Sequence, residues 1–368
     1  MNTIQILGVS DYSKTLNLKI NAHKALNNLG LRANWEEITD IETLLDFHLA
    51  GIPALAIDGK IIYQKDLPSV KNLELLFHLF STEKSELGQI NHILIPTDFS
   101  TISREAYEYA HCLAAHFSAD LELLNVHFPN ALEATPFYLN YAATDIQLKK
   151  ESLIAFAKAT PLPPSCCDEH RVEIQEHFSV ACGLPEDVIV KKSQNEDVDL
   201  IVMSTTGENG WYQKWLGSIS RHTAMNAKCP VLLIPKGITY RCPRHILYAT
   251  NYHPNEFQAL EQLIIFAKYF KSQIHIIHVA ESETDKIEPE KSIASQPFRN
   301  GLPNLYYKIS TIVDKNISTG LNRYVAENNI DLIAMPTINR PFFNQLFHKS
   351  TTKDMAIQTK IPLLVLHI

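Results

Sequence analysis

The sequence predicts an α/β protein with two open parallel sheets in tandem, preceded by a smaller α/β domain. Short apolar runs bounded by polar turns alternate with longer stretches at helical spacing, as in parallel sheets covered by helices. The landmarks of this pattern occur twice along the chain. In addition, 368 residues are too many for one ordinary hydrophobic core.

Composition argues against two classes of partner. Hydrophobic residues make up 45% and charged residues 20% of the chain, as in soluble globular proteins. The net charge of -7, with no Lys/Arg cluster, argues against a nucleic-acid partner. No apolar run reaches the ~18 residues of a membrane span, so no membrane partner is predicted. The start, MNTIQILGVSDYSK, lacks the features of a signal peptide, and we expect a cytoplasmic protein.

The cysteines and histidines predict no metal site. The cysteines form neither a C-x-x-C pair nor a zinc-binding spacing, so we expect reduced thiols. They are Cys112, Cys166, Cys167, Cys182, Cys229 and Cys242. Adjacent Cys166-Cys167, in a proline-rich loop, leave a redox or metal role open. The 16 histidines are scattered, and none forms H-x-x-x-H with an acidic partner.

Residues 1–82 are predicted to form a domain of their own. The expected order is strand, helix, strand, helix, hairpin and helix. The corresponding segments are 3–9, 14–29, 33–39, 41–48, 51–63 and 69–80. Gly30 is expected to end the first helix, and Ser69 to cap the last. The hairpin is predicted to turn at Asp58-Gly59, a pair that favours a tight turn.

This order, with Pro53 just before the third strand, resembles the thioredoxin-like fold in its small single-domain form. The resemblance implies a cis peptide bond at Ile52-Pro53, facing the position of a redox site. The two catalytic cysteines would fall near Asp11 and Lys14, and neither is a thiol. Without a thiolate there is no nucleophile for disulfide exchange. We therefore expect a redox-inactive domain with a structural or partner-binding role.

A polar linker, 81–89, leads to a second α/β unit, predicted over 90–236. Strands are expected at 119–128, 200–203 and 231–235, and a strand with its following turn at 92–100 and at 172–183. Its expected helices lie at 103–117, 145–158, 184–195 and from Gly217-Ser218 to about Ala227.

A repeat predicts a third unit, over 241–368. His92-Ile93-Leu94 recurs 153 residues later as His245-Ile246-Leu247, and the same shift carries Val126 onto Val279. Further on, DLIVM at 199 recurs as DLIAM at 331, a shift of 132 that also maps Pro230 onto Pro362. Because the second shift is smaller than the first, the segment between these two landmarks is shorter in the second copy than in the first. The two final strands, PVLLI and PLLVL, are expected to pack together as an intrachain pseudo-dimer; a further homodimer is left open.

Polar residues follow two strands of the first copy. Asp98 comes directly after the strand 92–96, where a carboxylate can accept from an adenine amino group or a ribose hydroxyl. The alternative is that Asp98 only caps the next helix. Gly207 allows a close approach of backbone to a ligand. Gly217-Ser218 would present free N–H groups and a hydroxyl at a helix N-terminus, where a phosphate fits; ordinary turn and capping roles explain the same residues.

The stretch from Asp199 to Pro235 resembles the nucleotide-binding signature of the universal stress protein family, with Ser204 in its first glycine position. IPTDFS and the strand ending at Val126 also match that family. The resemblance implies an adenine nucleotide alpha hydrolase-like, Rossmann-like fold and an ATP or ADP site, with Mg²⁺ bound only together with nucleotide. Asp98 and Val126 would hold the adenine end. The implied site comprises Thr97, Asp98, Val126, Ser204, Gly207, Gly217 and Ser218.

The second copy has lost these residue types. Asn251 stands in place of Asp98, and Pro336 in place of Ser204. Asn339 and Lys349 replace the two glycines, and their Cβ atoms would crowd a backbone cradle. Ser350 alone survives, so we expect this copy to be a scaffold for the first.

Three hypotheses follow. The first is a stress-response regulator with one adenine-nucleotide site in the first copy and little or no hydrolysis. No base, arginine finger or Mg²⁺ carboxylate pair is recognisable, so no catalytic residue is assigned. The second is an interaction protein without nucleotide, whose thioredoxin-like domain recruits partners. The third, a redox enzyme built on that domain, needs a thiol that the sequence does not place there.

Overall fold

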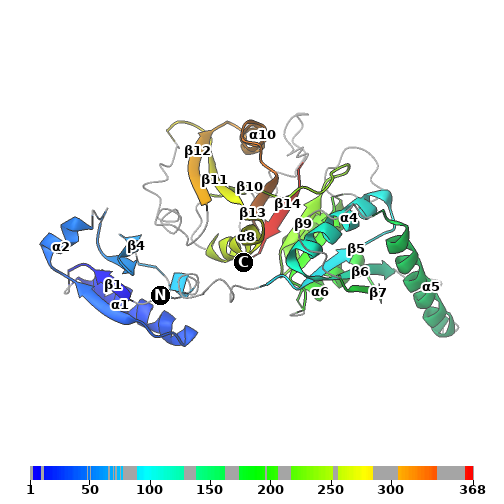
Figure 1. Cartoon of the computed structure of the whole chain (residues 1–368), viewed down its shortest axis with the longest axis horizontal. Coiled ribbons are helices and arrows are strands. Elements are labelled where there is room, and N and C mark those ends of the chain that lie inside the picture. The colour runs from blue at the N-terminus through cyan, green and yellow to red at the C-terminus, as the bar shows by residue number, and fades with distance from the viewer. Residues whose placement is uncertain are drawn as a thin grey trace.

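The structure is a computed structural model of the whole chain. It describes residues 3–9, 12–47, 49, 51–64, 67–68, 70, 73–74, 76–77, 89–127, 138–161, 174–194, 197–205, 217–251, 256–284, 306–337 and 361–367. The strands in these residues form a four-stranded and a ten-stranded sheet (Figure 1).

The N-terminal domain has the predicted order of elements. They are β1 Thr3–Leu7, α1 Ser13–Leu29, β2 Asn34–Ile38, α2 Ile41–Asp46, β3 Ala54–Ile57 and β4 Lys60–Gln64. The sheet order is β2-β1-β3-β4, with β1 and β2 parallel. The Ile52-Pro53 bond is cis, as predicted. Within the expected last helix the described residues 70, 73, 74, 76 and 77 are helical; Ser69 lies outside the described residues.

Local residue chemistry explains these boundaries. Apolar residues of α1 at helical spacing, among them Leu18, Ala22 and Leu26, are buried with Ile4 of β1. The helix ends at Gly30, whose φ of 64° is left-handed. The β3–β4 turn has φ 50° at Asp58 and 80° at Gly59, the angles for which an Asp-Gly pair is suited.

The ten-stranded sheet has the order β12-β11-β10-β13-β14-β9-β8-β5-β6-β7. We call β5 to β9 with their helices the first lobe. Its elements are β5 His92–Pro96, α4 Thr101–Phe117, β6 Asp120–His127, α5 Tyr138–Ala159, β7 Glu176–Cys182, α6 Pro185–Ser193, β8 Leu200–Ser204, α7 Ser218–Asn226 and β9 Val231–Ile234. The strands are parallel within the lobe, and β5, β8 and β9 are almost wholly apolar and buried, as sheets covered on both faces require.

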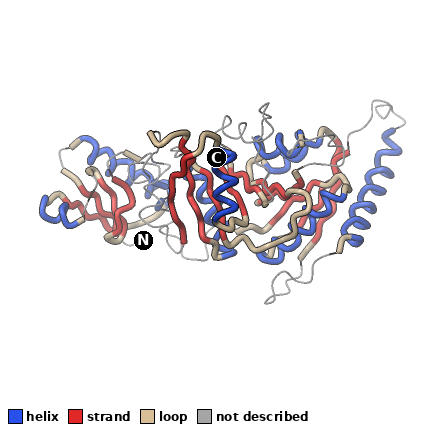
Figure 2. Tube along the Cα trace, turned by 90° about the horizontal axis from the view of Figure 1, so that it is seen from above, coloured by secondary structure: helices blue, strands red, loops and turns tan. Residues whose placement is uncertain are grey.

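The second lobe comprises β10 to β14 with their helices. Its elements are β10 His245–Ala249, α8 Phe257–Phe270, β11 Gln273–Ala280, β12 Tyr306–Val313, α10 Ile317–Glu327, β13 Leu332–Pro336 and β14 Leu363–Leu366. The strands are again parallel, and their order mirrors that of the first lobe. Figure 2 shows the strands of the two lobes side by side.

The lobes meet at β9 and β14, which are the two strands expected to pack together. They pair antiparallel, with Leu364 opposite Leu232, Leu363 opposite Leu233 and Val365 opposite Val231. Leu232 and Leu364 are equivalent positions at the shift of 132, so the register is symmetric about this pair. The seam is therefore isologous, as in a two-fold dimer.

Helices α4 and α8 repeat this symmetry. Phe117 of α4 and Phe270 of α8 are equivalent at the shift of 153, and their ring centroids lie 5.4 Å apart. Phe117 also packs edge-on against Tyr269 and Phe266. Such edge-to-face contacts favour aromatic pairs beyond the burial of their area. The two lobes thus share one aromatic cluster as well as one sheet.

One expectation about the cysteines is wrong. Cys112, buried on α4, is disulfide-bonded rather than reduced; the spacing of the cysteines along the sequence does not predict this bond. Cys182, Cys229 and Cys242 are free thiols. Cys166 and Cys167 lie outside the described residues. Within the described residues no helix is long and apolar enough to cross a membrane, and no group of side chains is suited to hold a metal ion.

Candidate functional site

The site in the first lobe lies where the chain reverses its direction across the sheet. From β5 the chain builds outward through β6 to β7, and it then returns to the other side of β5 for β8 and β9. Ligands of open α/β sheets bind beyond the carboxyl ends of the strands at such a reversal. Asp98 follows β5, and Ser204 ends β8, so two predicted site residues flank this point.

Asp98 lies exposed on the short loop between β5 and α4. Its Oδ1 accepts a hydrogen bond from the Ser100 amide at 3.1 Å. Ser100, not Asp98, is the N-cap of α4, and its hydroxyl accepts from the Ser103 amide. Asp98 Oδ2 makes no hydrogen bond with the described part of the chain. Ser100 therefore fills the capping role that was the alternative for Asp98. The side chain of Asp98 is exposed, and its Oδ2 is available to a ligand.

Thr97 points into the fold instead. Its hydroxyl lies 2.9 Å from the Ser103 hydroxyl and accepts from the Phe99 amide at 3.0 Å. Phe99 has a φ of 64°, a left-handed angle that few bulky residues adopt. The Thr97 side chain is only 6% exposed. Its contribution is to fix the loop that carries Asp98.

Asn125 was not predicted, and it supports the same loop from β6. Its side-chain amide donates to the Thr97 carbonyl at 2.9 Å. The sequence held a sign of this role, because Asn125 stands within the mostly apolar strand segment LELLNVHF. A side-chain amide buried in such a strand needs a hydrogen-bond partner. Val126, the next residue, is half-buried opposite Ala181 of β7, near the carboxyl end of β6. The structure thus brings Val126 and Asp98 to the same edge of the sheet.

On the other side of this reversal lies the start of α7. Gly217 is the N-cap, with extended backbone and no side chain to satisfy the first N–H groups of the helix. Ser218 is exposed at the first helical position. Ser220, which was also not predicted, is buried, and its hydroxyl donates to the Ser204 carbonyl at 2.8 Å. This bond ties the helix N-terminus to the end of β8. Gly207 lies outside the described residues.

The corresponding place in the second lobe is filled by Glu256. This residue is equivalent to Ser103 and is 4% exposed at the N-cap of α8. One carboxylate oxygen accepts from Thr250 at 2.6 Å and Tyr248 at 3.2 Å, and the other from the Asn251 amide at 3.2 Å. Burial, and then the Glu256 charge, raises the pKa of Tyr248. A buried carboxyl group thus occupies, in the second lobe, the position that Ser103 has in the first. Asn339, Lys349 and Ser350 lie outside the described residues.

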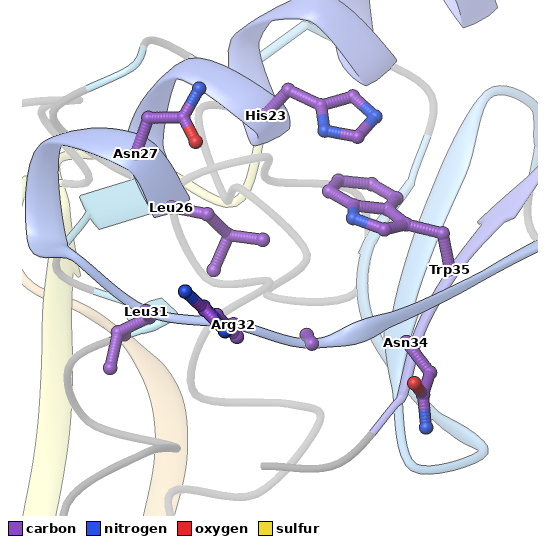
Figure 3. A pocket seen from close by; sticks show the side chains of 8 residues that line it. His23, Leu26, Asn27, Leu31, Arg32, Asn34 and Trp35 are labelled. Atoms are coloured by element: carbon purple, nitrogen blue, oxygen red, sulfur yellow. The ribbon is translucent and has the colours of Figure 1, made fainter.

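The N-terminal domain has a separate open cavity of about 680 Å³ beside the edge strand β2. His23 stacks on Trp35 with ring centroids 3.7 Å apart (Figure 3). Arg32, Asn27 and Asn34 add polar groups to its lining. The cavity does not include Pro53 or Lys14. Asp11 lies outside the described residues.

Comparison with known proteins agrees with this architecture. A model of the universal stress protein family matches residues 89–235, and a model of a thioredoxin domain matches residues 2–78. Universal stress protein MJ0531 of Methanocaldococcus jannaschii is 33% identical over 144 residues, which are 39% of this chain and 81% of that protein. The chain belongs to the universal stress protein family. Universal stress protein YxiE of Bacillus subtilis is 27% identical over 153 residues, covering 39% of this chain and 98% of YxiE.

The tandem arrangement of this universal stress protein has a counterpart among solved structures. A universal stress protein from Archaeoglobus fulgidus DSM 4304 aligns with 76% of this chain and 97% of its own, with a TM-score of 0.54. The sequence identity is 18%, so the likeness shows the fold alone. It agrees with the two lobes as tandem universal stress protein domains.

Proposed function

We propose that the first lobe binds ATP or ADP and that the protein is a nucleotide-responsive stress regulator with little or no hydrolysis. The observation that carries the proposal is the placement of an exposed carboxylate and an uncapped helix N-terminus on the two sides of the reversal between β5 and β8. A purine with its ribose needs hydrogen-bond acceptors and an apolar contact, and its phosphates need backbone N–H groups.

Each residue has a distinct part in this proposal. Asp98 Oδ2 accepts from the adenine amino group or a ribose hydroxyl, and Val126 offers an apolar contact to the base. Gly217 and Ser218 give the phosphates N–H groups and a hydroxyl at the positive end of α7. Ser204 and Gly207 complete the loop, and Thr97 holds Asp98 in place. Mg²⁺ would arrive with the nucleotide, coordinated by its phosphates.

Little hydrolysis is expected from the chemistry of the described residues. Phosphoryl transfer depends on a positioned water, a cation on the leaving phosphate and carboxylates that hold Mg²⁺. After β5 and at the start of α7 the described residues offer hydroxyls, backbone amides and the Asp98 carboxylate. Helix α7 also carries Arg221 and His222, but it supplies no second carboxylate to hold Mg²⁺. A bound nucleotide would then act as a signal. The cytoplasmic location stays a prediction.

Calorimetric titration tests the site. ATP should bind the full chain once, and Asp98→Ala should weaken binding by about tenfold or more, because a hydrogen bond to a charged group contributes about 1.5–3 kcal/mol. Asn251→Ala, the equivalent change in the second lobe, is the control and should leave affinity unchanged. Ser218→Ala should weaken ATP but not adenosine. Equal affinity in wild type and Asp98→Ala would reject the site.

A second candidate, an interaction protein without nucleotide, is favoured by exposed apolar side chains on the N-terminal domain. Ile41 and Leu45 of α2 are 72% and 71% exposed, and Leu16 and Ile20 of α1 are 54% and 53% exposed. Apolar residues grouped on helix surfaces mark interaction sites. The same titration separates the two candidates, since this one predicts no heat with ATP or ADP for any of the variants.

A further inference from the structure

A cysteine and a histidine meet between the two lobes. Cys242 lies in the connector from β9 to β10, and His116 lies near the end of α4. His116 Nε2 is 3.1 Å from Cys242 Sγ, within hydrogen-bonding distance. Cys242 is a free, half-buried thiol, so part of its surface remains open to solvent. This geometry is that of a thiol next to a base.

The groups around the pair come from both lobes and from the connector. The Tyr240 hydroxyl lies 3.9 Å from Cys242 Sγ, and the Tyr240 ring packs against the rings of His116 and Tyr109. Arg244, two residues along, is bonded to the Phe270 carbonyl at 2.7 Å. It is the charged group that acts on His116.

Burial of His116 lowers the pKa of its imidazole, and the positive charge of Arg244 lowers it further. The lower pKa favours the neutral ring, and in the tautomer protonated at Nδ1 its Nε2 can accept the thiol proton. We propose that Cys242 is a modification site, a nucleophilic thiol assisted by His116 and oxidised by hydroperoxides.

The oxidation of Cys242 consumes one hydrogen peroxide and releases one water. His116 Nε2 takes the proton from the Cys242 thiol, and the sulfur attacks one oxygen of hydrogen peroxide. The S–O bond forms as the O–O bond breaks, and the departing hydroxide takes the proton from His116 to become water. Sulfur is oxidised by two electrons to a sulfenic acid, and the peroxide is reduced. The product places an extra oxygen at the seam beside His116, Tyr240 and the aromatic cluster.

Two other thiols provide internal controls. Burial raises the pKa of the Cys229 thiol to about 12, so this residue should be inert. Cys182 is exposed at the end of β7 and has no hydrogen-bond partner in the described residues. The reaction rate of Cys182 therefore shows how fast an accessible thiol of this protein reacts without a neighbouring base.

The experiment measures the alkylation of each thiol by iodoacetamide in the full chain, by mass spectrometry, between pH 6 and 8.5. An unassisted thiol with a pKa of about 8.5 reacts tenfold faster per pH unit in this range. The rate of Cys182, an exposed free thiol, is the reference. Cys242 should react at a nearly constant rate above pH 6.5, because the neutral thiol and the neutral base react together. Dimedone trapping after limiting peroxide should label Cys242 ahead of Cys182.

His116→Gln keeps a hydrogen-bonding side chain but no base, and should slow Cys242 alkylation at pH 7 by about tenfold or more without affecting Cys182. His111→Gln, a change elsewhere on α4, is the matched control and should change neither rate. A Cys242 rate that rises in parallel with that of Cys182 in the wild-type protein would overturn the proposal, whether or not the variants fold.

Discussion

His367 joins the second lobe to α7 of the first. It follows β14, is 6% exposed, and its Nε2 donates to the Ala224 carbonyl of α7 at 2.9 Å. Gln262 of α8 holds its backbone with two hydrogen bonds. The far end of α7 carries Gly217 and Ser218, so one helix joins the seam to the proposed phosphate contacts.

Acid should lower the free energy of unfolding, because it protonates His367. Burial lowers the pKa of His367 from 6.5 to about 4, against an opposing effect of the Ala224 and Cys229 carbonyls. The folded state favours the neutral form of His367 more strongly than the unfolded state does. The contribution of His367 to the free energy of unfolding is therefore fully present above pH 6.5 and is lost as the pH falls toward 4. The loss by pH 4 is on the order of 3 kcal/mol.

Urea denaturation of wild type and His367→Gln from pH 4 to 7.5 measures this loss. The Gln amide can still donate to the Ala224 carbonyl but does not titrate. The variant should therefore lose less stability over this range. Parallel curves for the two proteins would assign the acid sensitivity to other groups.

At the scale of elements, α4 and α8 begin by different means although they are equivalent. Ser100 caps α4 through its hydroxyl, whereas the buried carboxylate of Glu256 receives three donors at the start of α8. Thr97 and Thr250 are equivalent, and so are Asn125 and His278, each of which lies 2.9–3.0 Å from the threonine carbonyl. The two lobes thus share the backbone arrangement at this point but differ in the polar side chains that support it.

Glu256→Ala should destabilise the second lobe by about 3 kcal/mol or more, because it leaves buried donors without an acceptor. The equivalent Ser103→Ala should cost only about 1 kcal/mol. Chemical denaturation of both variants, followed by hydrogen exchange in β10 and α8, checks the difference. Equal losses in the two variants would mean that Glu256 acts only as an ordinary cap.

Elements were predictable where local chemistry decides them. The helix expected over 14–29 and the turn at Asp58-Gly59 follow from spacing and from φ preferences, and both are confirmed. The inward orientation of Thr97 and the roles of Asn125 and Ser220 were not predicted, because they depend on hydrogen bonds between segments distant in the chain. The disulfide of Cys112 was also not predicted, because the spacing of the cysteines does not indicate it.

At the scale of the molecule, the repeat predicted that the two final strands meet but not how. The antiparallel register centred on Leu232 and Leu364 follows from a two-fold relation between lobes. The contact of Phe117 with Phe270 follows from the same relation. No local pattern in the sequence encodes either contact, since each joins residues more than 130 positions apart.

A double-mutant cycle on Phe117→Ala and Phe270→Ala should show this coupling. Each change removes a buried ring and should cost about 3 kcal/mol or more, and the pair should deviate from additivity by about 0.5–1.5 kcal/mol. The cycle of Phe117→Ala with Phe77→Ala, in the core of the N-terminal domain, should be additive. Stability is measured by chemical denaturation. Additivity in both cycles would mean that the rings pack independently.

The strand pairing between β9 and β14 also bears on how such a chain changes over time. Two separate copies that assemble with each other depend on their abundance, and a substitution in their common gene alters both at once. Here the halves are tethered, so their assembly is insensitive to dilution. Each lobe also acquires substitutions independently of the other. One lobe can therefore change its binding residues while the other continues to stabilise it through the paired strands.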